Sequence, residues 1–316
     1  MSTLTYGDVE AAAGRIGALI RPVAVAGTDP GAFNGARVHL AAEFMQHTGS
    51  FKARGAANFV TAHLERGSMP EAGVVIASGG NAGLACAWAA GRHRIPATVF
   101  VPRTAPAVKV ARLRAYGAQV RHSGDEYAEA LEASHRYAAE SGALESHAYD
   151  HPLIAAGAGT LLPEILAALP QGLDTVIVSV GGGGLFAGIA AAAHHHGVRV
   201  VAVEPEGSRA LNAAVEAGRP VDVTVESIAA DSLGARRASA MALEWAGRTR
   251  ARSLLVSDDA VVDARRSLWD RHRLAIEHGT AAAWAALTSG AYVPADGERV
   301  AVVLCGANTD PATLLD

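Results

Sequence analysis

Short apolar runs alternate with amphipathic stretches along most of the chain. The runs at 73–77, 97–101 and 119–122 have the length of buried strands, and the stretches between them carry apolar residues at a helical period. Strands that alternate with helical stretches of about ten to fifteen residues indicate βαβ units and a parallel sheet. The pattern therefore predicts the α/β fold class.

The same pattern predicts the order of the elements. In the first half we expect helices over 8–20, 52–64, 81–93, 107–116 and 125–141, and strands over 37–40, 73–77, 97–101 and 119–122. In the second half we expect a helix over about 155–168, a strand over 174–180, a helix over 185–196, a strand over 199–204, a helix capped by Asp258, and a last buried strand over 299–304.

The segment 149–152, which reads Tyr-Asp-His-Pro, marks a crossing point between two lobes. We expect two open parallel-sheet lobes. The larger domain would comprise residues 1–43 and 154–316, and the smaller domain, residues 44–153, would be inserted in it.

Composition and charge exclude several classes of protein. Half of the residues are hydrophobic and 18% are charged, which is typical of a soluble α/β protein. The net charge of −4, without a long basic run, does not indicate nucleic-acid binding. The first twenty residues do not resemble a signal peptide, and the apolar runs are too short and broken for a membrane span. Two cysteines, Cys86 and Cys305, form neither a disulfide framework nor a metal knuckle, so we expect a cytoplasmic protein.

One lysine has neighbours in the sequence that are unusual for a charged residue. Lys52 lies within the segment 43–56, EFMQHTGSFKARGA, where its neighbours are small or apolar. Lysine favours solvent, and desolvation lowers the pKa of its amine, which in its neutral form makes a Schiff base with an aldehyde. For an isolated Ser-Phe-Lys sequence, a surface lysine that begins a helix is the better interpretation. Three other stretches favour the chemical one.

The first stretch is a run of four glycines, 181–184, between a predicted strand and a predicted helix. Backbone amides in such a loop close around an anion, and the helix N-terminus adds positive potential, so a phosphate is the natural ligand. One alternative is a tight turn. Another is a relaxed dinucleotide fingerprint, Gly182-x-Gly184-x-x-Ala187, with Glu204 at the end of the next strand as the ribose ligand.

The second stretch, 78–83, reads SGGNAG and also joins a strand to a helix. It offers backbone amides for a carboxylate and the amide of Asn81 for a phenolic oxygen, although Asn81 would also serve as a plain helix cap. The third, Cys305-Gly-Ala-Asn, follows an apolar strand, where α/β sheets bind ligands; the alternative for Cys305 is a small buried hydrophobic residue.

Two further features give weaker indications of function. Glu277, with 279–281 behind it, precedes an apolar helix, where a cap or a surface acid is the default interpretation. The three consecutive histidines at 194–196 point about 100° apart on a helix and cannot chelate one ion well, so we interpret them as a solvated helix end.

Taken together, these motifs resemble the fold-type II family of pyridoxal-phosphate (PLP) enzymes, whose fold is like that of the tryptophan synthase β chain. Within it they resemble the serine/threonine dehydratases, with SGGNAG and a cysteine as in the mammalian-type L-serine dehydratases. The segment 46–56, SGGNAG, SVGGGGL, the Glu277 region and LCGAN follow in the family's order and spacing, over about 21–309. The resemblance favours a phosphate cup for PLP between the lobes over a dinucleotide site.

The resemblance implies a role for each motif residue. Lys52 would hold PLP as a Schiff base and then act as base and acid, while Phe51 packs on the pyridine ring. Asn81 would bind the ring's 3′ oxygen, and Cys305 would face the ring nitrogen. The phosphate would be held by Gly181, Gly182, Gly183, Gly184 and Leu185. The substrate would be bound by Thr48, Ser50, Ser78, Gly79, Gly80, Asn81 and Ala82.

The implied reaction is β-elimination of L-serine, L-threonine or a related β-hydroxy amino acid to a 2-oxo acid and ammonia. A thiol at Cys305 leaves the ring a weaker electron sink, which favours loss of a β leaving group. Racemases carry a second serine where this chain has Gly79, so we do not expect racemisation. His47, Ala156 and Ala158 border the expected pocket and leave room for larger substrates.

Alternatives remain within and outside this class. They are a β-replacement enzyme, a specialised lyase of secondary metabolism, a nicotinamide-dependent (NAD) oxidoreductase, and a non-catalytic binding protein that has kept the scaffold. The resemblance also implies a homodimer and a small-molecule amino-acid substrate. A monovalent or divalent cation near Glu204 is a further expectation, although Ala210 stands where an acid would help to bind it. We expect a catalytic unit without an appended feedback domain.

Overall fold

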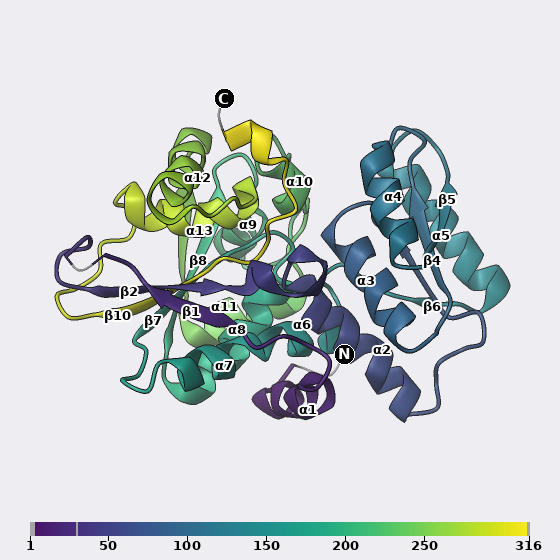
Figure 1. Cartoon of the computed structure of the whole chain (residues 1–316), viewed down its shortest axis with the longest axis horizontal. Helices are drawn as coiled ribbons and strands as arrows, with labels where there is room; N and C mark the ends of the chain where they lie inside the picture. The colour runs from purple at the N-terminus through teal and green to yellow at the C-terminus, as the bar shows by residue number, and fades with distance from the viewer. Residues whose placement is uncertain (1–3, 30, 315–316) are drawn as a thin grey trace.

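Two sheets of mainly parallel strands form the framework of the chain (Figure 1). The computed structural model describes residues 4–29 and 31–314. The six-stranded sheet has the order β1-β2-β10-β7-β8-β9, and the four-stranded sheet has the order β5-β4-β3-β6. Every pairing within the sheets is parallel except that of β1 with β2. The α/β prediction is therefore confirmed, whereas the domain boundaries stay a prediction.

The strands of the larger sheet are β1 (Ala24–Gly27), β2 (Arg37–Ala42), β7 (Thr175–Ser179), β8 (Arg199–Pro205), β9 (Arg252–Val256) and β10 (Arg299–Val303). Those of the smaller sheet are β3 (Val74–Ala77), β4 (Ala97–Val101), β5 (Gln119–His122) and β6 (Leu144–Glu145). Short 3-10 turns lie at η1 (Glu43–Met45), η2 (His47–Gly49) and η3 (Pro311–Leu314).

The helices before the second half of the large sheet are α1 (Tyr6–Ile16), α2 (Lys52–Glu65), α3 (Asn81–Arg92), α4 (Ala107–Ala115), α5 (Tyr127–Ser141), α6 (Pro152–Gly159) and α7 (Leu161–Ala168). The later ones are α8 (Gly184–His196), α9 (Ala210–Ala217), α10 (Ala230–Leu233), α11 (Ala240–Thr249), α12 (Asp258–His272) and α13 (His278–Thr288). None of the described helices is long and apolar enough to cross a membrane.

Three predicted helices differ from the observed ones. The first begins at Tyr6, where Thr5 and Asp8 form a capping box, and ends at Ile16 instead of reaching residue 20. The predicted helix over 155–168 is two helices, because Pro163 has no N–H to donate to the carbonyl of Gly159. The cap of α12 is Ser257, not Asp258: its extended backbone and its bond from the Ala260 N–H leave Asp258 inside the helix.

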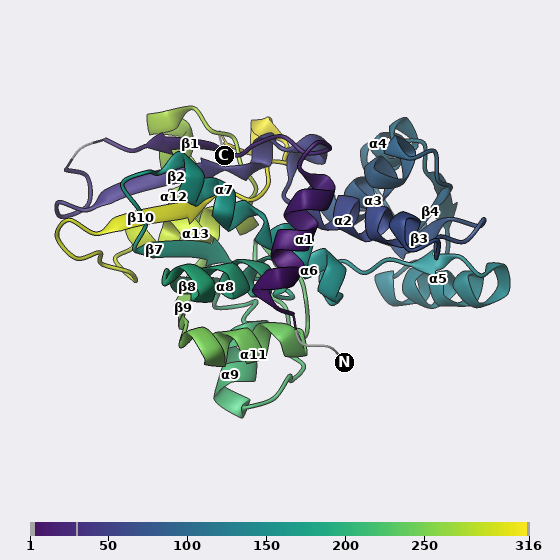
Figure 2. The same cartoon turned by 90° about the horizontal axis from the view of Figure 1, so that it is seen from below.

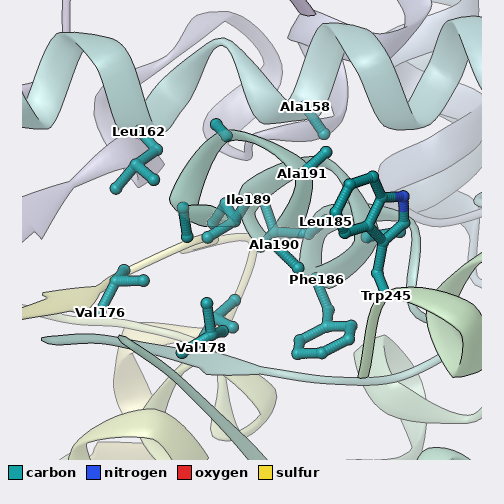
Figure 3. Close-up of a cluster of buried hydrophobic side chains, with 14 of the residues drawn as sticks. Ala158, Leu162, Val176, Val178, Leu185, Phe186, Ile189, Ala190, Ala191 and Trp245 are labelled. Atoms are coloured by element: carbon teal, nitrogen blue, oxygen red, sulfur yellow. The ribbon is translucent and has the colours of Figure 1, made fainter. Parts of the chain in front are cut away.

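Helix α8 lies at the centre of the larger core (Figure 3). Its apolar side chains, such as Phe186 and Ile189, are fully buried near Val176 and Val178 of β7. On its other side it meets α6 backbone to backbone, since a Cβ at Gly188 would lie 2.1 Å from the carbonyl oxygen of Ala155. This packing fixes where the N-terminus of α8 points.

The smaller sheet is covered on both faces (Figure 2). Successive side chains of a strand point to opposite faces. Val74 and Ile76 of β3 therefore pack in the cluster that contains α2 and α3, whereas Val75 and Ala77 pack with α5. Because both faces are buried, β3 and β4 are continuous apolar runs, which is why their positions were readable from the sequence.

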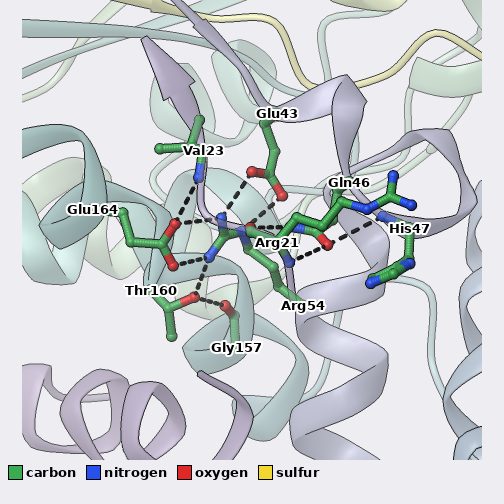
Figure 4. A network of polar contacts seen from close by, with 9 residues as sticks. All are labelled: Arg21, Val23, Glu43, Gln46, His47, Arg54, Gly157, Thr160 and Glu164. Carbon is green, nitrogen blue, oxygen red and sulfur yellow. Dashed lines mark hydrogen bonds and ion pairs between the residues drawn. The ribbon is translucent and has the colours of Figure 1, made fainter. Parts of the chain in front are cut away.

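A buried arginine ties α2 to the larger unit (Figure 4). The side chain of Arg54 is fully buried, and its guanidinium donates to both oxygens of Glu43 at 2.7 and 2.9 Å and to both oxygens of Glu164 at 2.6 and 2.8 Å. It also donates to the hydroxyl of Thr160 at 3.0 Å. These contacts join the first turn of α2 to η1 and α7, and they hold in place the helix that Lys52 begins.

Replacement of this arginine should be strongly destabilising. Arg54→Ala leaves the fully buried carboxylate of Glu43 without its cation, next to the partly exposed carboxylate of Glu164, and we expect a loss of about 3–5 kcal/mol in the free energy of unfolding. Urea denaturation measures it. The control is Arg136→Ala, whose exposed partner Glu132 lies one helical turn away and whose loss should cost no more than about 0.5 kcal/mol. Equal effects of the two variants would contradict the structural role of Arg54.

Candidate active site

The predicted site residues meet in a cleft of about 940 Å³ between the two sheets. Four segments that are remote in the sequence line it: the start of α2 with Phe51 and Lys52, the loop after β3, the glycine loop after β7, and the end of β10 with Cys305. Of the predicted residues, those that line the cleft are Phe51, Lys52, Ser78, Gly79, Gly80, Asn81, Ala82, Gly181, Gly182, Gly183, Gly184, Leu185 and Cys305.

Lys52 is the first residue of α2, and its amine lies inside the cleft. The Nζ atom donates a hydrogen bond of 2.7 Å to the carbonyl oxygen of Ala148 and lies 4.7 Å from the centre of the Phe51 ring. Burial lowers the pKa of Lys52 to about 8, although the negative charge of Glu277 opposes the shift. A large fraction of the amine is therefore neutral and nucleophilic near pH 8.

The glycine loop is packed so tightly that side chains would not fit. A Cβ at Gly182 would lie 2.4 Å from the Tyr149 ring, and one at Gly184 would lie 2.7 Å from the carbonyl oxygen of Tyr149. Gly183 has a φ of +94°, and a Cβ there would lie 2.3 Å from that of Ala242. Only glycine lets the chain close in this way at the N-terminus of the 13-residue helix α8, a geometry that suits a phosphate group.

The loop Ser78–Ala82 forms a second helix start, at α3. Its cap is Gly80 rather than Asn81, and no side chain bonds to the first-turn amides. The interpretation of Asn81 as a plain cap is thus wrong. A Cβ at Gly83 would lie 1.9 Å from the carbonyl oxygen of Ser78, so the loop folds closely over the helix. The amides at this N-terminus suit a carboxylate.

Asn81 points across the cleft instead of toward its own helix. Its Nδ2 donates to both carboxylate oxygens of Glu277 at 2.9 and 3.0 Å, and its Oδ1 accepts from Nδ2 of Asn308 at 2.7 Å. Glu277 occupies the N-cap position of α13, as one of its default interpretations had it, but its side chain makes no cap hydrogen bond. It is only 7% exposed, so the interpretation as a surface acid is wrong. Residues 81 and 277 are 196 positions apart, and no local sequence signal links them.

Cys305 presents a neutral thiol to the cleft. Burial raises its pKa to about 12. The hydroxyl of Thr280 donates its one hydrogen to the carbonyl oxygen of Gly306 at 2.8 Å, so in the 3.3 Å contact between Thr280 and Cys305 the thiol is the donor. The sequence did not indicate a role for Thr280. In the structure its hydroxyl oxygen accepts the hydrogen of the Cys305 thiol.

Thr48 and Ser50 are buried just before α2, but neither lines the cleft. Among the described residues, both hydroxyl oxygens lack a hydrogen-bond partner. The backbone of Ser50 bridges that of Gly306, and the Phe51 N–H donates to the carbonyl oxygen of Cys305 at 2.9 Å. This pairing brings the lysine segment against the end of β10. The substrate role of the two hydroxyl residues stays a prediction.

Glu204 does not face the cleft. Its side chain is fully buried, and its two oxygens accept from the backbone N–H groups of Leu211 and Asn212, each at 2.7 Å, at the start of α9. Burial raises its pKa to about 8. Glu204 is therefore not available as the ribose ligand of a dinucleotide. Across the part of the chain that the structure describes, no three His, Cys, Asp or Glu side chains group to hold a metal, and the cation near Glu204 stays a prediction.

Comparisons with known proteins agree with this geometry. Residues 28–306 match the family described as "Pyridoxal-phosphate dependent enzyme". The chain is 37% identical to the phenylserine dehydratase of Ralstonia pickettii, over 99% of this chain and 97% of that protein. It is 35% identical to the serine dehydratase-like protein of Mus musculus, over 87% and 86% of the two chains. The structure of maize serine racemase superposes with a TM-score of 0.92 at 28% identity and covers 99% of this chain and 96% of that one.

The residues of the cleft fit pyridoxal phosphate. The glycine loop suits its phosphate, and the buried amine of Lys52 suits its aldehyde. Asn81 presents an amide for the ring oxygen, and Cys305 presents a neutral group for the ring nitrogen. The cofactor of this chain is accordingly pyridoxal 5′-phosphate.

The lowered pKa of Lys52 predicts how the apoprotein takes up its cofactor. Only the neutral amine attacks the aldehyde, so the rate of incorporation should rise with pH through about pH 8, not through the 10.5 of an ordinary lysine. Stopped-flow absorbance measures this rate. A rise centred near the ordinary value would contradict the effect of burial.

The chain supplies an internal control, because it contains only two lysines, Lys52 and Lys109. Lys109 lies at the mouth of the cleft, where its amine pairs with Asp231 at 2.5 Å. Borohydride reduction followed by peptide mapping should place the pyridoxyl group on Lys52. Equal labelling of Lys109 would show unspecific reaction.

Proposed function

The chain belongs to the family of pyridoxal-phosphate dependent enzymes, and from this we propose that it is an ammonia-lyase for a β-hydroxy amino acid. The reaction removes the β-hydroxyl group with the Cα proton as water. Hydrolysis then regains that water and releases ammonia and a 2-oxo acid. The proposal rests on the residues of the cleft and on the names of two relatives, a phenylserine dehydratase and a serine dehydratase-like protein.

When bound, the cofactor would supply an electron-withdrawing ring linked to the substrate through its amino nitrogen, so that charge formed at Cα could be withdrawn. The chain supplies the groups around it. The amine of Lys52, with a pKa of about 8, exchanges protons near neutral pH and is suited to take the Cα proton. The amides of the Ser78–Ala82 loop would hold the carboxylate, which orients the amino acid over that amine.

The observation that carries the proposal is the neutral thiol at Cys305. A carboxylate in that place would keep the ring nitrogen protonated and favour a long-lived negative charge at Cα. The thiol of Cys305, whose pKa is about 12, does not do so. The ring then withdraws less charge, and prompt departure of a β substituent is favoured over slow exchange of the Cα proton.

The loop supports elimination over racemisation. Racemisation needs a second proton-transfer group on the face opposite the lysine, and Gly79 has no side chain to supply one. Next to it, Gly80 also lacks a side chain, and Asn81 is bonded to Glu277 and Asn308. Of the groups that α2 and this loop bring to the cleft, Lys52 and the hydroxyl of Ser78 carry exchangeable protons, and the lowered pKa of Lys52 makes it the better base.

The cleft has room for substrates larger than serine. Apolar and aromatic residues line its outer part on the side of the smaller sheet, among them Pro102, Tyr127 and Leu131. We therefore include β-hydroxy amino acids with an aromatic side chain, such as phenylserine, beside serine and threonine. A site of about 940 Å³ that also holds the cofactor is within the usual range for such ligands.

The test is a parallel assay of 2-oxo acid, ammonia and cofactor absorbance with L-serine, L-threonine and L-phenylserine. We expect equal amounts of 2-oxo acid and ammonia with at least one of them. Lys52→Ala should lower this activity by at least roughly 10²-fold, since it removes the proton-transfer group. Undiminished turnover in Lys52→Ala would refute the mechanism. An absorbance change without 2-oxo acid, followed by product formation only when a second nucleophile is added, would show β-replacement instead.

The role of Gly79 gives a gain-of-function prediction. A Cβ at this position would lie 3.5 Å from Cγ1 of Val101, an ordinary contact, so Gly79→Ser fits without distortion. Its hydroxyl would stand where racemases carry their second serine, and we expect D-amino acid to form beside the 2-oxo acid. Chiral chromatography detects it, and Gly79→Ala is the matched control without a hydroxyl. No D-product from Gly79→Ser would mean that further groups on that face are required.

A further inference from the structure

A series of hydrogen bonds runs from the exposed Arg112 to Asn81 and Glu277, which line the cleft. The guanidinium of Arg112, on α4, donates to Oδ1 of Asn308. Nδ2 of Asn308 donates to the carbonyl oxygen of Thr48 and to Oδ1 of Asn81, each at 2.7 Å. Nδ2 of Asn81 donates to both oxygens of Glu277, and the backbone N–H of Asn308 donates to Oε1 of Glu277 at 2.8 Å. This series of hydrogen bonds thus begins at α4, on the side of the smaller sheet, and ends at the start of α13.

The direction of donation along this series of hydrogen bonds is fixed at both of its ends. A guanidinium and a backbone N–H only donate, and a backbone carbonyl and a carboxylate only accept. Arg112 and Thr48 therefore determine which atom of the Asn308 side chain is oxygen and which is nitrogen. Asn308 then presents a donor to Oδ1 of Asn81, and Glu277 presents two acceptors to its Nδ2. The amide of Asn81 has one orientation that satisfies all these partners.

We propose that Glu277 is a positioning residue that sets the orientation of the Asn81 amide toward the cofactor. One hydrogen of Nδ2 is shared between the two carboxylate oxygens, which leaves the second free for the ring oxygen of pyridoxal phosphate. If the amide turned over, its oxygen would face both the carboxylate and the ring oxygen. Two oxygen–oxygen contacts would replace two hydrogen bonds.

The surroundings of Glu277 keep its carboxylate in place. It is 7% exposed, and a Cβ at Gly306 would lie 2.9 Å from its Oε1, so the backbone of Gly306 lies directly against it. The backbone N–H of Glu277 donates to the carbonyl oxygen of Gly306 at 3.2 Å. A carboxylate that accepts from Asn81 and from the backbone N–H of Asn308, and whose own backbone is bonded to Gly306, is held firmly enough to orient another side chain.

This inference rests on the cofactor and not on the identity of the amino-acid substrate. It is tested on the holoenzyme without substrate, so its failure and the failure of the lyase proposal are distinguishable. Two quantities report on the ring oxygen. One is the dissociation constant of pyridoxal phosphate. The other is the ratio of the visible to the near-ultraviolet absorbance of the bound cofactor, which depends on whether that oxygen is ionised.

The first variant is Glu277→Gln, which keeps the shape of the side chain but places an NH₂ group against Nδ2 of Asn81. We expect roughly ten-fold weaker binding of pyridoxal phosphate, the loss of about one hydrogen bond, and a shift of absorbance toward the near-ultraviolet band. The control is Glu298→Gln, a glutamate of the same 7% exposure that bonds Thr175, Tyr292 and Arg199 away from the cleft. It should lower thermal stability without moving the spectrum. A spectral shift of equal size in the control would overturn the inference.

A double-mutant cycle shows whether Glu277 acts through Asn81. In an Asn81→Ala background, Glu277→Gln should change the dissociation constant of pyridoxal phosphate by less than about two-fold. A ten-fold effect that persists in that background would mean that Glu277 acts on Lys52 or Cys305 directly, and would refute the inference. Should Glu277→Gln fail to fold, Asn308→Ala removes the partner of Asn81 Oδ1 and leaves Glu277 intact. It should shift the spectrum in the same direction, and an unchanged spectrum would also refute the inference.

Discussion

The buried guanidinium of Arg54 between Glu43 and Glu164 is the interaction on which the site depends. The three groups come from α2, η1 and α7, so the helix that carries Lys52 is attached at its first turn to the larger unit. The rest of α2 packs with α3, in the core of the smaller sheet. Lys52 therefore stands where the two units join. A buried ion pair contributes little to net stability, but the loss of one partner is costly because it leaves an uncompensated buried charge.

The cleft follows from this attachment. Each sheet brings one glycine-rich turn to a helix N-terminus, the Ser78–Ala82 loop at α3 and the 181–184 loop at α8, and each turn alone is a general anion site. Two such turns with the amine of Lys52 between them fit a smaller range of ligands. They suit a molecule with a phosphate, an aldehyde and a partner carrying a carboxylate, which describes the cofactor together with an amino acid.

The sequence determined the parts of this picture that depend on local packing. The strands 97–101 and 119–122 were placed without error, because they lie in regular βαβ units bounded by turns. The edge strands β1 and β9 were missed, since they are short and their partly exposed residues do not alternate clearly. The four-residue helix α10 is too short to give a period, whereas α9 and α11 bury residues at helical spacing and were missed although that pattern is present. The positions of the four motifs were readable, but Glu277 and Asn308 were not assigned roles. Their partner Asn81 is 196 and 227 positions away, and only folding brings the three together.

The two ends of the cofactor ring meet opposite kinds of environment in this site. At the ring oxygen, our proposal is that the carboxylate of Glu277 would fix the amide of Asn81 so that an N–H group faces the ring, and that carboxylate accepts from the backbone N–H of Asn308. At the ring nitrogen would stand Cys305, whose thiol is neutral and donates its hydrogen to the hydroxyl of Thr280. With the cofactor bound, the neutral group at the nitrogen would limit the charge that the ring draws from Cα, while the amide at the oxygen would fix how the ring is held. A ring held in that state suits a substrate whose β hydroxyl can leave as the Cα proton is taken, and this is the chemistry that a single lysine, with glycine on the opposite face, is able to serve.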